Sequence, residues 1–270
     1  MYRKIIKLLN KYWAILTILL ACLIVTIFNL NIYWMLVDDG GNVVFARTLF
    51  EKIIHLNLLD FLSQLLEIGG RFRPVYWFYH VWVWLIGGNS FQFHHFAHMA
   101  VIGITVIFVY LILNELTKSK SISLFGSLFY LFIPLNTENI MRLGPQEPLV
   151  AMFFSILFYL LIKRSNIYLL CFVIILVVFT KETALAFLPV ILFYYLYYRK
   201  NSVDKEGERS IKLLITTIVS SVILVIITFL RRSGYSTNYF FNIGMIVNNL
   251  VLYLNELFTE TSGIFPLVVC

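Results

Sequence analysis

Charge is scarce in this sequence. Only 13% of the residues are charged and 60% are hydrophobic, whereas a soluble domain is typically about 45 to 50% apolar and about 25% charged. Residues 12–37 contain no Asp, Glu, Lys or Arg, and an apolar stretch longer than about 20 residues can cross a bilayer as a helix. This composition excludes an ordinary soluble domain and predicts an all-α, polytopic integral membrane protein.

Cysteine is also scarce. Of the three cysteines, Cys22 and Cys171 lie inside apolar runs and Cys270 is the last residue, so we expect neither a disulfide framework nor a cysteine metal site. The sequence lacks internal repeats, low-complexity tracts and any soluble-looking domain. No small-residue cleavage site follows the first apolar run, so we expect that run to be retained as a span.

The charged residues behind the net charge of +7 are distributed along the chain as a predicted membrane topology requires. With a cytoplasmic amino terminus and crossings that begin at residues 12, 91, 121, 149, 168, 184 and 213, 13 of the 21 Lys and Arg residues are cytoplasmic, while 10 of the 14 acids are outside. This distribution satisfies the positive-inside rule. The charge therefore indicates orientation rather than a nucleic-acid partner, and we expect about seven to eight spans in the cytoplasmic membrane of a prokaryote.

Residues 42–86 predict an outer loop built of interfacial helices. Arg47, Glu51 and His55 recur at helical spacing, and the other face carries Val44, Phe45, Leu49, Ile53 and Ile54, which is typical of a helix lying in the interface. Residues 57–60 resemble the start of a second surface helix. The aromatic run 75–86 is too short to span and predicts a third interfacial or partly inserted helix.

Two later apolar runs are unusually short. Residues 121–133 and 168–180 each provide about 13 apolar residues, or about 20 Å of helix, so we expect their outer ends to lie below the membrane surface. Charge and irregular backbone are tolerated at that depth where they line a water-filled cavity. The sequence thus predicts a polar depression bounded by residues 134–148 and 181–182.

The remaining segments complete the predicted architecture, a single transmembrane domain over residues 1–270. Residues 149–162 and 184–198 return to the cytoplasm, residues 199–212 form a cytoplasmic loop, and residues 213–230 cross outward. Residues 238–258 fit either an interfacial helix or a span. The apolar ending, residues 265–270, resembles the start of another segment and is consistent with a missing C-terminal region.

Charged residues of both signs collect in the outer loops. They are Asp38, Asp39, Arg71, Arg73, Arg142, Glu147, Lys181, Glu182 and Arg231. A carboxylate can accept a proton from an acceptor while cations hold an anionic leaving group such as phosphate. The alternative is that these groups only pair with each other and with lipid headgroups.

His94, His95 and His98 invite a metal interpretation because His94 and His98 lie one helical turn apart. Zinc would need a further ligand and outer hydrogen-bond partners, and none is evident nearby in the sequence. We therefore expect interfacial hydrogen-bonding histidines. The aromatic residues at 193–198 are typical of an interface belt.

The order of these features resembles a known family. The basic amino terminus, first span, Asp38-Asp39 pair, surface helices, Arg-x-Arg-Pro at 71–74, Arg-Leu-Gly-Pro-Gln-Glu-Pro at 142–148 and Thr-Lys-Glu-Thr at 180–183 resemble the GT-C glycosyltransferases. The similarity is greatest to the branch that includes the protein O-mannosyltransferases and the lipid A aminoarabinose transferases. It covers about residues 1–235.

The resemblance implies a hexosyl- or pentosyltransferase that uses a polyprenyl-phosphate-linked sugar, in contact with membrane lipids and an extracytoplasmic acceptor. It implies Asp38 as general base and Asp39 as a positioning acid, both at the outer face. Glu147 matches a second outer-loop acid, and Lys181, with Arg142 or Arg231, matches the lipid-phosphate site. We expect no required cofactor; a divalent metal on the Asp38, Asp39 and Glu147 oxygens is the alternative.

Two other classes remain open at the level of sequence. A transporter or flippase for a lipid-linked or anionic solute also places charges at membrane depth, although it should show inverted repeats with paired broken helices. A non-catalytic assembly subunit is the second, because a chain that stops at Cys270 would lack the C-terminal region of the family.

Overall fold

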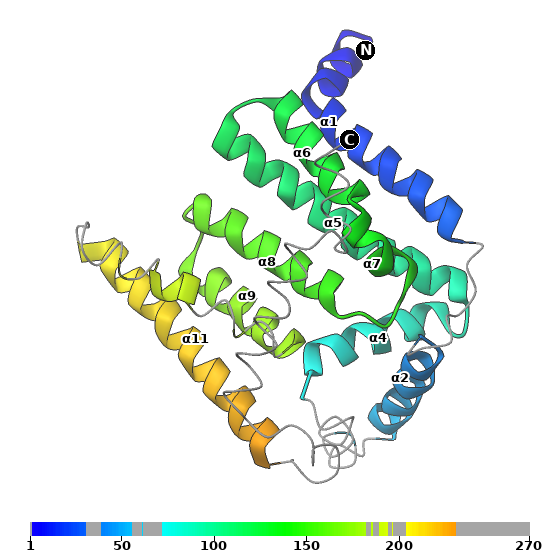
Figure 1. Ribbon diagram of the computed structural model, residues 1–270, viewed down its shortest axis with the longest axis vertical. Coiled ribbons are helices and arrows are strands. Elements are labelled where there is room, and N and C mark those ends of the chain that lie inside the picture. The colour runs from blue at the N-terminus through cyan, green and yellow to red at the C-terminus, as the bar shows by residue number, and fades with distance from the viewer. Residues whose placement is uncertain are drawn as a thin grey trace, which may run out of the picture. The chain divides into compact units, whose positions relative to one another are not determined.

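The computed structural model describes residues 2–30, 39–55, 61, 72–181, 185, 189–193, 196 and 204–230, which all lie in the first of two compact units, Met1–Arg231. Within these ranges every regular element is helical and no strand occurs (Figure 1). The predicted all-α class is therefore confirmed for the described part of the chain.

Three helices are long and apolar enough to cross a membrane. They are α1 (Tyr2–Asn29), α5 (Phe91–Thr117) and α11 (Asp204–Leu230), with candidate spans at Tyr12–Asn29, Phe91–Thr117 and Glu208–Ile227. Their outward-facing apolar side chains, such as Leu20 and Phe28 on α1, are exposed, as expected of surfaces that face lipid rather than protein. The chain is a helical membrane protein on this evidence.

Three further apolar helices are shorter. They are α6 (Lys120–Phe132), α8 (Glu147–Ile162) and α9 (Ile167–Thr180). At 1.5 Å per residue the 13 residues of α6 reach about 20 Å, less than the roughly 30 Å of a hydrocarbon core. Proline at position 134 ends α6 because it cannot continue the helix, and extended backbone at Lys181 ends α9. The predicted short helices are thus confirmed within one residue at each end.

The outer-loop helix α2 (Asp39–Ile54) differs from its predicted form. It begins at Asp39, before the glycine pair, rather than at residue 42. Its buried apolar side chains are Val43, Ala46 and Leu49, spaced as one helical face, and α2 packs on α4. Val44, Ile53 and Ile54, predicted on the apolar face of an interfacial helix, are exposed. The expected helix start at residues 57–60 lies outside the described residues.

Helix α4 (Pro74–Gly87) forms where the aromatic run predicts a helix. Proline at its first turn suits a position whose amide would lack a partner anyway. Gly88 then reverses the chain with φ of 55° and donates its amide to the Trp84 carbonyl at 2.7 Å. That backbone conformation favours glycine, and it leads directly to Ser90, whose hydroxyl accepts from the Phe93 amide and caps α5.

Helix α5 lies at the centre of the bundle, since it contacts α1, α4, α6, α7 and α8. One buried cluster joins α1, α5 and α6, around Ile18, Val106 and Leu131. A second joins α2, α4, α5 and α8, and a third joins α8, α9 and α11. Gly126 allows α6 to approach α5 closely, because a Cβ there would lie 2.6 Å from Leu113 Cδ1.

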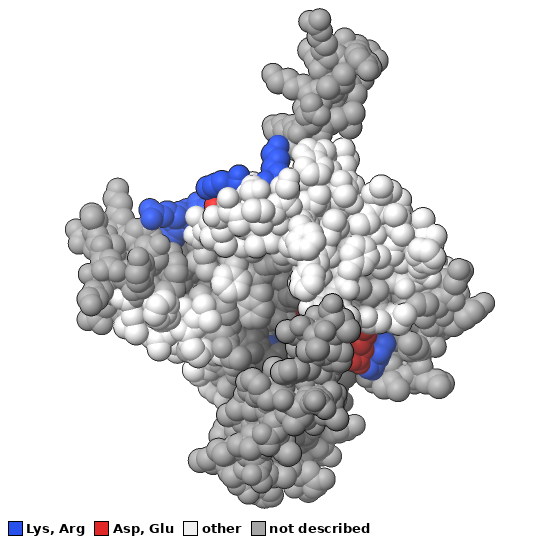
Figure 2. Space-filling view, turned by 45° about the horizontal axis from the view of Figure 1, so that its top comes forward, with Lys and Arg blue, Asp and Glu red and all other residues white. Residues whose placement is uncertain are grey.

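The helices place basic residues at one end of the bundle. Lys163 follows α8 and pairs with Glu115 near the end of α5 at 2.5 Å, and the Arg209 guanidinium of α11 donates to the Arg164 carbonyl at 3.0 Å. Figure 2 shows basic side chains along one edge above a broad uncharged surface. We call this the basic end; its residues are Lys118, Lys120, Lys163, Arg164, Arg209 and Lys212.

Residues 204–212, expected in the cytoplasmic loop, are the first turns of α11. The pair Glu208–Lys212, at 2.7 Å, supports this extension because side chains four apart meet on a helix. The opposite end of the bundle contains the 3-10 turn η2 (Pro134–Asn136), the short helix α7 (Thr137–Met141), the loop to Glu147, and Lys181. We call this the loop end.

Candidate functional site

The start of the outer-loop helix is tied to the loop end by a buried chain of hydrogen bonds. Asn42, one turn after Asp39 on α2, donates from Nδ2 to the Tyr76 hydroxyl at 2.9 Å. The Tyr76 hydroxyl in turn donates to the Gly144 carbonyl at 2.9 Å. Tyr76 is 2% exposed. The amino-terminal turn of α2, which opens with Asp39, is therefore fixed against the loop that precedes Glu147.

The end of α9 approaches the same region from another side. Phe72 and Phe179 meet edge to face with ring centroids 5.9 Å apart, and α4 contacts α9. Arg73, which immediately precedes α4, is buried. Buried arginine is rare in proteins unless its charge is paired. Three segments far apart in the sequence thus converge where the sequence predicts a polar site.

Lys181 and Glu147 form an ion pair across the two short helices α8 and α9. The Lys181 side chain is only 14% exposed, while Glu147 is 51% exposed. A cation withdrawn from water is costly unless an anion compensates it, so Glu147 stabilises the ammonium group of Lys181.

The pKa of Glu147 reflects this pairing. Partial burial raises it, but the hydrogen bond and charge of Lys181, together with hydrogen bonds from backbone amides at Gln146 and Glu147, lower it by more, so the pKa lies below its ordinary value. Glu147 is therefore ionised at neutral pH, and the pair is a salt bridge between charged groups.

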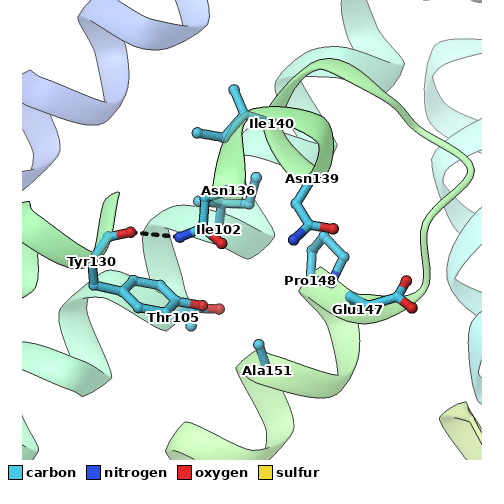
Figure 3. A pocket seen from close by; sticks show the side chains of 9 residues that line it. All are labelled: Ile102, Thr105, Tyr130, Asn136, Asn139, Ile140, Glu147, Pro148 and Ala151. Atoms are coloured by element: carbon cyan, nitrogen blue, oxygen red, sulfur yellow. Dashed lines mark hydrogen bonds between the residues drawn. The ribbon is translucent and has the colours of Figure 1, made fainter. Parts of the chain in front are cut away.

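A cavity of about 70 Å³ adjoins Glu147 at the loop end (Figure 3). It lies between α5, the end of α6 and the start of α8, and its polar lining consists of Thr105, Tyr130, Asn136, Asn139 and Glu147. The apolar lining comes from Ile102, Ile140, Pro148 and Ala151. It lies beside residues 134–148, one of the two predicted boundaries of the polar depression, while Lys181, at the other boundary, does not line it.

Four histidines lie buried behind this cavity, His80 on α4 and His94, His95 and His98 on α5. His98 Nε2 lies 2.5 Å from the Asn139 carbonyl and His94 Nε2 lies 2.9 Å from the Gly88 carbonyl. Since a carbonyl oxygen only accepts, Nε2 carries the proton in both rings. Within the described ranges, both ring nitrogens of His80 are buried without a hydrogen-bond partner.

Metal binding receives no geometric support in the part of the chain that the structure describes. There, no three side chains of His, Cys, Asp or Glu are arranged to hold a metal ion. His94 and His98 instead hydrogen-bond to backbone carbonyls; the sequence predicts hydrogen-bonding histidines at the interface, whereas both rings are buried.

The structure brings some of the predicted site residues together, leaves others apart and does not describe the rest. Lys181 and Glu147 are brought together, Arg73 lies at the start of α4, and Asp39 opens α2, although its side chain lies outside the described part. Arg142 forms an ion pair with Glu138 on α7 rather than with Glu147. Asp38, Arg71, Glu182 and Arg231 lie outside the described residues.

Sequence reasoning missed the neutral polar residues of the site. Asn42, Tyr76, Asn136 and Asn139 are each unremarkable in the sequence, and Tyr76 sits inside a run that reads as an interface belt. Only Asn136 and Asn139 carried a usable signal, because they fall in the polar break between two apolar runs.

Comparisons with protein families, with curated proteins and with solved structures found no match to this chain.

Proposed function

We propose that the chain is a membrane glycosyltransferase of the GT-C type, with about seven to eight spans, which moves a sugar from a polyprenyl-phosphate carrier to an acceptor outside the cytoplasm. The observation that carries this proposal is the Lys181–Glu147 pair. It withdraws a lysine from water at the end of a short helix, beside a polar cavity and the anchored start of α2.

The reaction needs a base and an anion site. An Asp38 or Asp39 carboxylate takes the proton of the acceptor hydroxyl, and the acceptor oxygen forms a bond to the anomeric carbon with inversion. The bond from that carbon to the phosphate oxygen breaks, and the electron pair leaves on polyprenyl phosphate. Lys181 stabilises the charge that develops on this leaving group.

The surroundings of Lys181 suit this role. The guanidinium of Arg142 is paired within α7, while Lys181 shares its charge with Glu147, whose carboxylate is half exposed and can turn toward solvent. A phosphate that approaches can therefore compete with Glu147 for the ammonium group. Because α9 is 14 residues long, Lys181 lies about 21 Å from the basic end, below the depth a full span would reach.

In this proposal the basic end faces the cytoplasm and the loop end faces outward, in the cytoplasmic membrane of a prokaryote. The exposed Lys and Arg side chains of the basic end then satisfy the positive-inside rule. A lipid-linked donor reaches Lys181 laterally, because short helices leave the outer ends of α6, α8 and α9 beneath the headgroups.

The general base is tested with Asp38→Asn and Asp39→Asn in membranes that contain the full chain. Transfer of radiolabelled sugar from undecaprenyl phosphate-linked donors should fall about 10²- to 10⁴-fold in the variant that removes the base. Glu51→Gln is the matched control, since Glu51 is a half-exposed acid on the same helix α2, paired with Arg47.

If both Asp variants and the parent transfer sugar equally well, the assigned base is wrong. If vesicles with the chain move the lipid-linked sugar across the bilayer without transferring it, the transporter alternative replaces the enzyme.

A further inference from the structure

The cavity beside Glu147 has an unusual lining for a site at this depth. Thr105 lies 12 residues before the end of α5, so it is about 18 Å along that helix from the basic end. Polar groups inside the span of a membrane protein are disfavoured unless they bind something or line water. Here amide, hydroxyl and phenol groups face one small volume of about 70 Å³.

Several of these groups have hydrogen-bonding capacity left over. Asn136 donates from Nδ2 to the Tyr130 carbonyl at 2.5 Å, which leaves its Oδ1 as an acceptor. Thr105 donates to the Val101 carbonyl at 3.0 Å, so its oxygen also remains an acceptor. The side-chain amide of Asn139 and the hydroxyl of Tyr130 make no hydrogen bond with other described residues. Figure 3 shows the Asn139 amide directed toward Pro148, across the cavity.

The walls of this cavity are held in place. His98, 4% exposed, donates to the Asn139 carbonyl and so fixes α7 against α5. The Glu138–Arg142 ion pair, within α7 and its C-cap, and the Asn136 bond to the end of α6 fix the remaining turns. A preformed site of this kind loses little conformational entropy when a ligand enters.

We propose that this cavity binds the sugar ring of the lipid-linked donor. The hydroxyl groups of the ring form hydrogen bonds with Asn136, Asn139, Thr105 and Tyr130. The inference rests on the proposed function and adds the sugar subsite to it. The lining mixes donors with acceptors, as a polyhydroxylated ring requires. Its one charged member, Glu147, is already paired with Lys181, so the cavity interior favours a neutral group over the phosphate.

The position of the cavity fits such a donor. Lys181 meets Glu147 at the rim, so a phosphate on Lys181 places the attached sugar beside the Asn139 amide. The polyprenyl chain has no groups that could hydrogen-bond to Asn136, Asn139 or Tyr130, and it stays in lipid. Phosphate recognition and sugar recognition thus fall on different residues, which allows them to be separated by experiment.

The test measures binding of two kinds of probe to the full chain in nanodiscs: undecaprenyl phosphate alone, and undecaprenyl phosphate carrying mannose, glucose, galactose or arabinose. At least one glycosylated probe should bind about tenfold more tightly than undecaprenyl phosphate, the gain expected of one or two neutral hydrogen bonds. Asn139→Leu and Tyr130→Phe should reduce that preference and leave binding of undecaprenyl phosphate unchanged. Retained binding of that probe also shows that each variant is folded.

Asn114→Leu is the matched control, an asparagine near the other end of α5. It should keep the sugar preference. Equal binding of the glycosylated and bare probes by the unmutated chain would overturn the sugar subsite while leaving the proposed enzyme intact. A preference that survives in both Asn139→Leu and Tyr130→Phe would do the same. A chain that binds neither probe would remove the proposed function, and the subsite with it.

Discussion

The basic end and the loop end of the bundle both contain lysine–glutamate pairs, but the environments of these pairs differ. At the basic end the side chains of Lys118 and Lys163 are 73% and 40% exposed, and both reach the same carboxylate, Glu115. At the loop end the side chain of Lys181 is 14% exposed. The lysines are therefore exposed at the basic end and withdrawn from water at the loop end, whereas the glutamates follow the opposite order, with Glu115 24% and Glu147 51% exposed.

The exposure of the lysines distinguishes charges that suit membrane orientation from a charge with a proposed role in the reaction. Exposed pairs contribute little to stability, typically about 0 to 1 kcal/mol, and under the proposed function the charges of the basic end serve orientation in the membrane. No orientation rule requires a withdrawn lysine beside a polar cavity. Under that proposal, the low exposure of Lys181 and its place beside the cavity single it out as the cation that binds the donor phosphate.

The difference between the two ends is tested most directly by substituting one lysine at each end. Lys181→Met should lower sugar transfer about 100-fold, the effect typical of losing one preorganised group that stabilises developing negative charge. It should raise the donor concentration needed for half-maximal rate, because Lys181 binds the donor phosphate before reaction, and it should also lower the maximal rate, because that contact strengthens as charge develops. Rates measured over a range of undecaprenyl phosphate-sugar concentrations check this.

Lys163→Met is the matched control at the basic end and should change the rate less than about twofold. An unchanged donor dependence in Lys181→Met would reject the phosphate role and make the two ends equivalent.

A smaller effect is expected from the hydrogen-bond chain that fixes α2 to the loop end. Tyr76→Phe removes one hydroxyl and leaves the buried Asn42 amide and the Gly144 carbonyl without it. A buried polar group that loses its partner costs about 1 to 3 kcal/mol. Thermal unfolding in detergent should show a lower midpoint for this variant.

Tyr168→Phe provides the reference at the basic end, because Tyr168 is 76% exposed on the first turn of α9. Its midpoint should match that of the unmutated chain. A midpoint for Tyr76→Phe that also matches would mean that water replaces the hydroxyl and that α2 is not anchored by it.

The smallest effect concerns the pH dependence of the Glu147–Lys181 pair. Because the pKa of Glu147 is lowered in the folded chain, the pair contributes stability above the unfolded pKa, and this contribution is lost as the pH falls through the folded pKa. The unmutated chain should therefore unfold at a higher temperature than Glu147→Gln at pH 6, and the difference should shrink as the pH is lowered below the ordinary pKa of a glutamate. Parallel curves across that range would show that the pair is not formed in solution.

Much of the architecture was predictable from local pattern. The bounds of α6 and α9 follow from Pro134 and from the first charged residue after an apolar run, and α4 follows from an aromatic stretch that starts at proline. The sequence predicts that Lys181 and Glu147 lie in the same region, but it does not predict their pairing or the burial of Lys181. Their pairing depends on α8 and α9 lying antiparallel, which short connections favour.

Other features depend on contacts between distant residues. Nothing near Tyr76 indicates that its hydroxyl joins positions 34 residues earlier and 68 residues later. The glycine pair at 40–41 looks like a helix break, yet both glycines lie in the first turn of α2. The sequence does not indicate a role for neutral amides such as Asn139, because that role depends on the cavity they line.

The guanidinium of Arg209 also constrains the order of assembly. It donates to the carbonyls of Arg164 and Ser165, in the turn where α8 gives way to α9, and it lies 45 and 44 residues after them in the chain. Until α11 packs beside α9, water must serve those carbonyls. Docking of α11 is therefore the step that completes the turn at the basic end.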